Sequence, residues 1–303
     1  MYTTNGQMTH ETDILCIGHI THDHIITPQT DIHMPGGTSF YFSYGIKSLM
    51  GKRRDIRYRL LTSLAESDMN AVEDMRKEGI DVDVIPSKAT VYFENIYEEN
   101  QNNRRQRVCA KAEPFTIERM GDIRARYIVL GSLLADDFSL DVIRHLSQCG
   151  TLVVDAQGYL REVRGEQVFP IDWEEKREAL SHIDILKVNE FEIEVLTGLS
   201  DQHKACRLLA EWGVKEVLLT LGSYGSVVYA DGVFHDIPPY EPLRIVDATG
   251  CGDTYVMAYV YRRLQGYEPA DAGRFASAVA SIKLEASGPF RGTETDALAR
   301  VSH

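Results

Sequence analysis

The sequence lacks the features of a membrane protein or of a nucleic-acid-binding surface. Its 303 residues contain no uninterrupted apolar run long enough to cross a bilayer. Lys and Arg number 32 against 45 Asp and Glu, which gives a net charge of −13 and argues against binding to nucleic acid or to acidic lipid. The five cysteines are widely spaced and form no CxxC pair, so we expect free thiols. The polar N-terminal segment has no apolar signal core, and a cytoplasmic protein is therefore expected.

Short apolar runs alternate with helical patterns along most of the chain, which is typical of a parallel sheet covered on both faces. The runs read as strands cover residues 14–18, 57–64, 127–131, 151–155, 183–187 and 217–221. The patterns read as helices cover residues 40–50, 68–79, 137–148 and 202–212. In such sheets ligands bind beyond the carboxyl ends of the strands. We find no linker or repeat, and residues 1–303 are interpreted as one domain.

The segment 90–110 breaks this alternation. It has little helical periodicity and indicates two strands joined by a polar turn near residues 100–103. We interpret it as a β-hairpin that covers a site as a lid, although a purely structural hairpin fits the same pattern. The apolar side chains of Val91, Phe93 and Tyr97 would also allow a homodimer through this lid.

The stretch from Asp247 to Tyr255, with the sequence DATGCGDTY, carries the most chemical information. A buried strand ending at Ile245 and Val246 is expected to lead into a glycine turn and then a helix. The backbone amides at the helix start would bind one negatively charged group. These are the amides of Gly250, Cys251 and Gly252. The carboxylate of Asp253 suits a base that takes a proton from a hydroxyl attacking phosphorus; an ordinary helix start is the alternative.

Three further motifs accompany this turn. Asn189-Glu-Phe-Glu192 follows a strand and offers an amide and a carboxylate, although an N-capped helix start would look the same. Thr220-Leu-Gly222-Ser-Tyr-Gly225 is a glycine loop that could approach phosphate. A hairpin turn into the strand at 226–229 is the alternative, and both interpretations can hold together. Near the N-terminus, Asp23 could accept hydrogen bonds from two neighbouring hydroxyls, and the Gly36-Gly37 pair follows it.

In this order, the motifs resemble the ribokinase-like family of carbohydrate kinases, also called the PfkB family, over nearly the whole chain. The resemblance implies a three-layer α/β/α fold with a mostly parallel central sheet and a small β lid. It also implies an ATP-dependent phosphotransferase acting on a hydroxyl of a small sugar or cyclitol. A non-catalytic small-molecule-binding or regulatory protein on the same fold is the competing interpretation. Retention of both the glycine turn and Asp253 favours the enzyme.

The resemblance assigns roles to these residues. Asp253 would be the catalytic base, and the amides of Gly250, Cys251 and Gly252 would form the anion hole. Asp23, Gly36 and Gly37 would bind the acceptor. Asn189, Thr220, Gly222 and Gly225 would bind the nucleotide, and Glu192 with Asn189 would place Mg²⁺, through water. The resemblance implies ATP and Mg²⁺ as cofactors. Asp247, with a companion loop at Ser287-Gly288, matches a position that contributes to monovalent-cation binding in some members and not in many others, so the resemblance also allows K⁺.

The acceptor is less well marked. Thr38 to Tyr41 stand where sugar kinases of the family such as ribokinase have an asparagine, which argues against ribose. Residues 155–161, with Asp155, Gln157 and Arg161, and the glycine segment 35–41 resemble the myo-inositol kinase branch. A strand-end turn is the alternative interpretation of Asp155 and Gln157. A cyclitol is accordingly the leading acceptor.

Three histidines near Asp23 suggest a second kind of site. His22 and His24 would share one face of a strand, with Asp23 on the other. Together with His19 they could bind a metal, but no second group of ligands is visible in the sequence. We therefore favour a polar segment beside the substrate site.

Overall fold

The computed structural model describes residues 12–97 and 104–302, and the structural statements below refer to these residues. The strands are β1 (Ile14–Gly18), β2 (Thr21–Ile26), β3 (Asp31–Gly36), β4 (Tyr58–Leu64), β5 (Val82–Pro86), β6 (Val91–Tyr97), β7 (Arg104–Ala110), β8 (Tyr127–Gly131), β9 (Thr151–Asp155), β10 (Arg161–Arg164), β11 (Gln167–Pro170), β12 (Ile185–Asn189), β13 (Glu216–Thr220), β14 (Ser226–Ala230) and β15 (Val233–Ile237). The helices are α1 (Thr38–Met50), α2 (Met69–Lys77), α3 (Ile117–Met120), α4 (Leu140–Leu146), α5 (Lys176–Leu180), α6 (Glu190–Thr197), α7 (Gln202–Glu211), α8 (Cys251–Leu264), α9 (Pro269–Lys283) and α10 (Glu294–Val301), with short 3₁₀ turns η1 (Glu66–Asp68), η2 (Gly158–Leu160) and η3 (Gly222–Tyr224).

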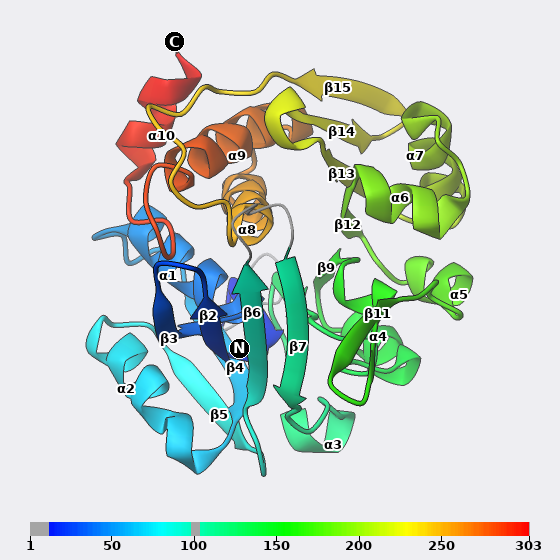
Figure 1. Cartoon of the computed structure of the whole chain (residues 1–303). Coiled ribbons are helices and arrows are strands. Elements are labelled where there is room, and N and C mark those ends of the chain that lie inside the picture. Colours follow the sequence, from blue (N-terminus) through cyan, green and yellow to red (C-terminus); the bar gives the residue numbers. More distant parts are fainter. Residues whose placement is uncertain (1–11, 98–103, 303) are drawn as a thin grey trace, which may run out of the picture.

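A large sheet runs through the centre of the molecule (Figure 1). Its strand order, within the described residues, is β15-β14-β13-β12-β9-β8-β1-β4-β5. The strands from β13 to β5 are parallel, whereas β13, β14 and β15 pair antiparallel at one edge. The predicted mostly parallel central sheet is therefore confirmed.

Alternate residues of the parallel strands face two separate hydrophobic cores. Cys16, Val129 and Val153 pack into a core with α1, α2, α8, α9 and α10. Their neighbours Leu15, Ile128 and Leu152 pack into a second core with α3, α4, α5, α6 and α7. Because successive strand side chains point to opposite faces, these apolar runs must be covered on both sides, and the three-layer α/β/α arrangement follows.

A second, smaller sheet covers one end of the central sheet. Its order is β10-β11-β7-β6-β2-β3. The hairpin of β6 and β7 is antiparallel as predicted, while the turn expected at residues 100–103 lies outside the described residues. The lid is larger than the predicted segment 90–110, because β2 pairs parallel with β6 and brings β3 with it, and β11 pairs with β7. These added strands are short or rich in polar residues, so periodicity did not mark them.

The structure differs from what the sequence suggested at the strand expected before the glycine turn, and at the lid residues Val91 and Phe93. Ile245 and Val246 do not end a buried strand: their exposed fractions are 77% and 51%. The sheet ends at β15, and the chain then crosses to the end of α9, where the Val246 amide donates to the Leu284 carbonyl at 2.8 Å. Val91 and Phe93, which suggested a dimer surface, are buried in the chain's own lid cluster.

Helix boundaries follow local capping. The helix predicted at 137–148 begins at Leu140, because the Ser139 side chain caps it, whereas Asp137 accepts the amides of Leu133 and Leu134. No helix in the described segments combines the length and apolarity needed to span a membrane.

Candidate active site

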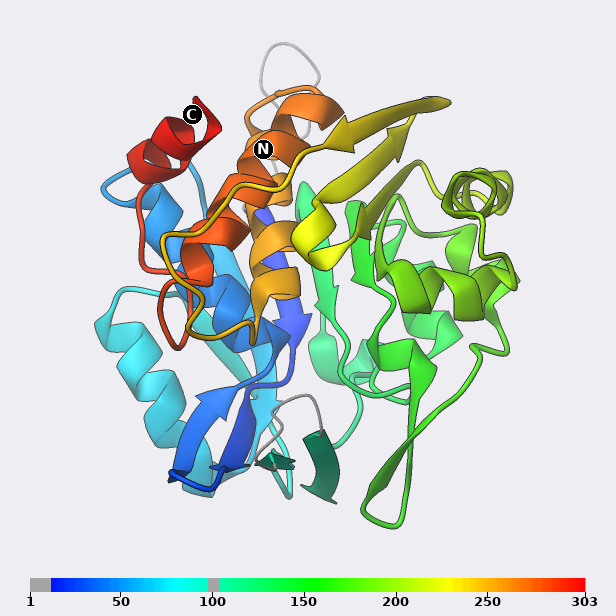
Figure 2. The ribbon, with the colours of Figure 1, turned by 45° about the horizontal axis from the view of Figure 1, so that its top comes forward.

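The predicted motifs meet at one edge of the central sheet. Strands β1, β9, β12 and β13 are parallel, so their carboxyl ends, at Gly18, Asp155, Asn189 and Thr220, lie along the same edge. The N-terminal end of α8 approaches this edge beside the blue lid strands (Figure 2). A binding site beyond the strand ends is the arrangement expected for such sheets.

The glycine turn before α8 is tightly packed. Gly250 has φ +76°, and a Cβ there would lie 2.2 Å from the Tyr41 ring, so only glycine fits. The Cys251 amide donates to the Ala248 carbonyl at 3.2 Å, which leaves the amides of Gly250 and Gly252 without a backbone acceptor in the described chain. Burial raises the pKa of the Cys251 thiol to about 11, so this side chain stays protonated at neutral pH.

Asp253 lies in the first turn of α8. Burial, followed by the nearby Asp155 carboxylate, raises its pKa to about 6. A hydrogen bond from the Thr38 hydroxyl and the positive charges of Lys187 and Arg161 oppose this rise. The carboxylate is thus basic enough to accept a proton, yet largely ionised at neutral pH.

Asp23 and the two glycines form the lid side of the site. The Thr21 hydroxyl donates to Asp23 Oδ1 at 2.6 Å. A Cβ on Gly36 would lie 2.2 Å from Asp23 Oδ2, so this glycine allows the carboxylate to approach the chain. Gly37 has φ +87° and precedes α1, whose first residue is Thr38. The segment 36–38 therefore touches Asp23 at one end and Asp253 at the other.

Lys187 is a site residue that the sequence motifs did not reveal. Its side chain is 5% exposed, and its Nζ lies 3.0 Å from Asp155 Oδ2 and 3.7 Å from Glu192 Oε2. A Cβ on Gly252 would lie 3.2 Å from this Nζ. The ammonium therefore stands between two carboxylates and the glycine turn, and Asp155 and Glu192 raise the pKa of Lys187 despite its burial. It is charged at any physiological pH.

Asn189 and Glu192 form a capping box at the start of α6, as the alternative interpretation of this motif predicted. Asn189 Oδ1 accepts the amides of Phe191 and Glu192 at 2.9 and 2.8 Å. Glu192 Oε2 accepts the Asn189 amide at 2.8 Å. Burial raises the pKa of Glu192, while Lys187 opposes the shift. Because Asn189 Oδ1 is already engaged twice, the pair fits a hydrated Mg²⁺ held through water rather than direct ligation by Asn189.

The glycine loop after β13 is a hairpin turn, which confirms the alternative interpretation of that motif. Thr220 pairs with Ser226 across β13 and β14, and with Asn189 across β13 and β12. Gly222 and Gly225 both have positive φ, +56° and +91°. A side chain on Gly225 would collide with the backbone after β15, whereas Gly222 faces open space. The loop thus stands directly beside the capping box of α6.

Asp155 and Gln157 also form the strand-end turn considered above, since the Gln157 amide donates to Asp155 Oδ1 at 3.0 Å. Asp155 nevertheless faces the site through its contact with Lys187. Asp155 is therefore both part of the strand-end turn and a residue of the site.

Asp247, at the expected monovalent-cation position, contacts the positively charged side chain of Lys283. Lys283, whose side chain has no exposed surface, places its Nζ 2.8 Å from the Asp247 carbonyl oxygen and 3.3 Å from Oδ2. Ser287 Oγ lies 3.5 Å from Oδ2, so the loop at Ser287-Gly288 contacts Asp247. Burial alone would raise the pKa of Asp247, but hydrogen bonds from Thr249 and the positive charge of Lys283 lower it below its usual value.

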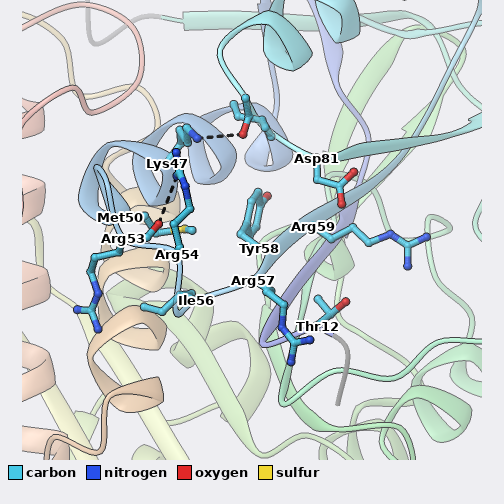
Figure 3. Close-up of a pocket in the computed structure, with 12 residues that line it drawn as sticks. Thr12, Lys47, Met50, Arg53, Arg54, Ile56, Arg57, Tyr58, Arg59 and Asp81 are labelled. Atoms are coloured by element: carbon cyan, nitrogen blue, oxygen red, sulfur yellow. Dashed lines mark hydrogen bonds between the residues drawn. The ribbon is translucent and has the colours of Figure 1, made fainter. Parts of the chain in front are cut away.

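A pocket of about 320 Å³ lies at the opposite edge of the sheet, by the amino ends of β1 and β4 (Figure 3). Several cationic side chains line it, but Arg53 and Arg59 point away from its centre. They pair with Asp55 and Asp83 respectively. The motif residues all lie at the other edge, so this pocket is not part of the candidate site.

Comparison with known proteins agrees with this geometry. The family model described as "pfkB family carbohydrate kinase" matches residues 71–296. The chain belongs to the PfkB family of carbohydrate kinases. This PfkB protein is 27% identical over 262 residues to a cytidine kinase of Thermococcus kodakarensis, covering 82% of this chain and 87% of the relative.

Solved structures of the family superpose closely on this PfkB protein. A pyrophosphate-dependent kinase of the ribokinase family, complexed with a pyrophosphate analogue and myo-inositol, has a TM-score of 0.82 at 29% identity and covers 94% of this chain and 99% of that one. Ribokinase of Arabidopsis thaliana, complexed with ribose and ATP, has a TM-score of 0.75 at 19% identity, covers 96% and 99%, and supports the fold alone. The ribokinase-like fold predicted from the motifs is confirmed.

Proposed function

We propose that this PfkB protein transfers a phosphoryl group to a hydroxyl of a small sugar or cyclitol, with Asp253 as the catalytic base. The observation that carries the proposal is the position of Asp253: a carboxylate of raised pKa at the N-terminal end of α8, directly after a glycine turn. A site that only bound anions would not bind them more tightly with a carboxylate there, because the two negative charges repel each other. A base that must meet both a hydroxyl and a phosphoryl group has to lie at such a point.

The acceptor would lie between Asp23 and Asp253. The segment 36–38 contacts both carboxylates, so a molecule bound against it can place one hydroxyl at Asp253 and others at Asp23. Neighbouring hydroxyls of a ring polyol match the two acceptor oxygens of a carboxylate. The lid strands β2 and β3 carry this side of the site, and they would exclude water from it.

The phosphoryl group would be held by the glycine turn and by Lys187. The amides of Gly250 and Gly252 provide hydrogen-bond donors at the positive end of α8. The Lys187 ammonium stands beside the same turn. Negative charge that develops on the oxygens of the transferred phosphoryl group would therefore be stabilised by amides and an ammonium group that are already in place, so the protein would not have to rearrange. Mg²⁺ bound through water at Glu192 would neutralise part of the charge of the donor phosphates.

The donor and the acceptor can be identified in one assay. The sequence resemblance implies ATP, with Thr220, Gly222 and Gly225 near its phosphates, whereas the similar kinase whose structure contains myo-inositol is pyrophosphate-dependent. We would measure Mg²⁺-dependent turnover of ATP and of pyrophosphate with myo-inositol, ribose, fructose and nucleosides. We expect one acceptor, a cyclitol, to be phosphorylated. Binding of a polyol without turnover of either donor would contradict the kinase and support a non-catalytic binding protein.

The Asp247 position does not require an added cation, in our proposal, because the Lys283 ammonium already contacts its carbonyl and carboxylate oxygens. Hard cations such as K⁺ bind to the same kind of oxygen ligand. Lys283 would thus hold the turn 247–250 in shape and supply positive charge behind it. The enzyme would be active without K⁺.

The pKa of Asp253 predicts how activity depends on pH. A base must be unprotonated to act, so kcat/KM should fall about tenfold per pH unit below an apparent pKa of about 6. Asp155→Asn should move this limb to lower pH, because it removes a carboxylate that raises the pKa and frees Lys187 to lower it. We would measure kcat/KM against pH for both proteins. A limb at the same pH in both would assign it to another group.

A further inference from the structure

The outer face of the lid carries a compact group of histidines and carboxylates. β2 and β3 pair antiparallel, with His24 directly opposite His33. Alternate residues share a face, so His22 and His24 of β2 lie with Asp31 and His33 of β3, while Asp23 lies on the inner face. The second group of ligands that was not visible in the sequence is thus supplied by the neighbouring strand.

The side chains of three of these residues converge. His24 Nε2 lies 2.6 Å from Asp31 Oδ1. The rings of His24 and His33 stack with 4.0 Å between their centroids. One ligand atom from each of His24, Asp31 and His33 lies within 4.8 Å of the others. Small rotations of the two rings would bring two nitrogens and a carboxylate oxygen around a common point.

The opposite nitrogen of each of the two rings has its own partner. His24 Nδ1 lies 3.3 Å from the Tyr92 hydroxyl and 3.7 Å from Glu94 Oε2. Histidines that bind a metal through one nitrogen characteristically donate the other N–H to a carboxylate or similar acceptor. His24 Nε2 donates its proton to Asp31 Oδ1 at 2.6 Å, and a metal bound at Nε2 would displace that proton. The N–H would then stand on Nδ1, where Tyr92 and Glu94 lie.

His33 has an equivalent arrangement, through a second histidine. His33 Nδ1 lies 2.9 Å from His22 Nε2, and His22 Nδ1 lies 3.5 Å from Asp68 Oδ1. Proton donation from His33 to His22, and from His22 to Asp68, leaves Nε2 of His33 unprotonated.

We propose that His24, His33 and Asp31 bind a divalent transition-metal ion such as Zn²⁺ on the outer face of the lid. Two imidazole nitrogens and one carboxylate oxygen are a common zinc ligand set, with a fourth position left for water. Asp31, whose side chain is 72% exposed, gives the ion access from solvent, while His24, 15% exposed, fixes the inner side of the site. The bound ion would tie β2 to β3 on the face opposite Asp23. This site does not depend on the proposed kinase activity.

The test is metal binding by the full chain after removal of metal with a chelator. Zn²⁺ titration calorimetry should give one site in the wild type. Loss of a residue that hydrogen-bonds a metal ligand typically costs 10- to 100-fold in metal affinity, so Glu94→Gln should weaken Zn²⁺ binding about tenfold. His24→Gln and His33→Gln remove a ligand itself, so each should weaken binding more than about 100-fold. His182→Gln, a histidine on another part of the molecule, is the matched control and should bind as the wild type does.

Co²⁺ absorption identifies the ligand atoms independently. A site of two histidines and a carboxylate gives weak visible bands without the strong ultraviolet charge-transfer band of a thiolate. A thiolate band would assign the binding to a cysteine. That result, absence of Zn²⁺ binding to the wild type, or unchanged affinity in both histidine variants would overturn the proposal and leave the group as a hydrogen-bonded polar cluster.

Discussion

Asp253→Asn should lower kcat by about 10²- to 10⁴-fold, the range that a positioned general base contributes. Asparagine keeps the shape of the side chain and can still contact Thr38, but it cannot accept the proton of the attacking hydroxyl. Binding of the donor should change little, because the amides of Gly250 and Gly252 belong to the backbone. The measurements are steady-state turnover with the acceptor found above and calorimetric titration of the donor.

A control separates this effect from the loss of one negative charge. Asp122→Asn changes an exposed aspartate in the connection before β8 and should leave kcat and donor affinity as in the wild type. Asp253→Asn should also lose the acid limb of the pH–activity profile near pH 6, since the carboxylate that produces this limb is gone. Full turnover in the Asp253→Asn protein would refute the assignment of the base, whatever the acceptor.

Lys283→Met should convert a K⁺-independent enzyme into one that requires K⁺. Methionine fills the buried volume of the lysine stem but removes the ammonium from Asp247. The Asp247 oxygens and Ser287 Oγ would then face a site without its cation. We expect a fall in kcat of about ten- to a hundredfold without added cation, less than the 10²- to 10³-fold cost of losing a direct oxyanion donor.

The measured quantity is turnover in two different salts. Turnover would be compared in KCl and in choline chloride at equal ionic strength, with Lys283→Arg as the variant that keeps the charge and Lys88→Met, at an exposed lysine, as the control. Only Lys283→Met should recover in KCl. Strong K⁺ activation of the wild type would show that Lys283 does not replace the cation. Failure of K⁺ to rescue a folded Lys283→Met protein would limit the lysine to a packing role.

The sequence determined the architecture because the signals involved are local. Continuous apolar runs such as 127–131 and 151–155 must be buried on both faces, and both became the strands β8 and β9 with the predicted boundaries. The stretch 247–255 contains within itself the glycine with positive φ, the helix start and the carboxylate. Such features depend on residues a few positions apart, so they can be read in order along the chain.

Contacts between distant segments were decided only by the tertiary structure. Lys187 looked like the end of a strand, and only the packing of β12 between β9 and β13 places its ammonium against Asp155 and beside Gly252. Likewise, Lys283 at the end of α9 reaches Asp247 across 36 residues of chain. A charged residue in a sequence gives its charge but not its partner, because the partner is set by which strands and helices become neighbours.

The lid shows the same limit. The hairpin of β6 and β7 was predictable from its composition, but β2 and β3 joined it through parallel pairing between segments about 70 residues apart. That pairing puts Asp23 on the inner face of the lid and gathers His24, His33 and Asp31 on its outer face. The order of residues along each strand sets which side chains share a face. The pairing of the strands, which depends on long-range burial and register, decided what those side chains meet.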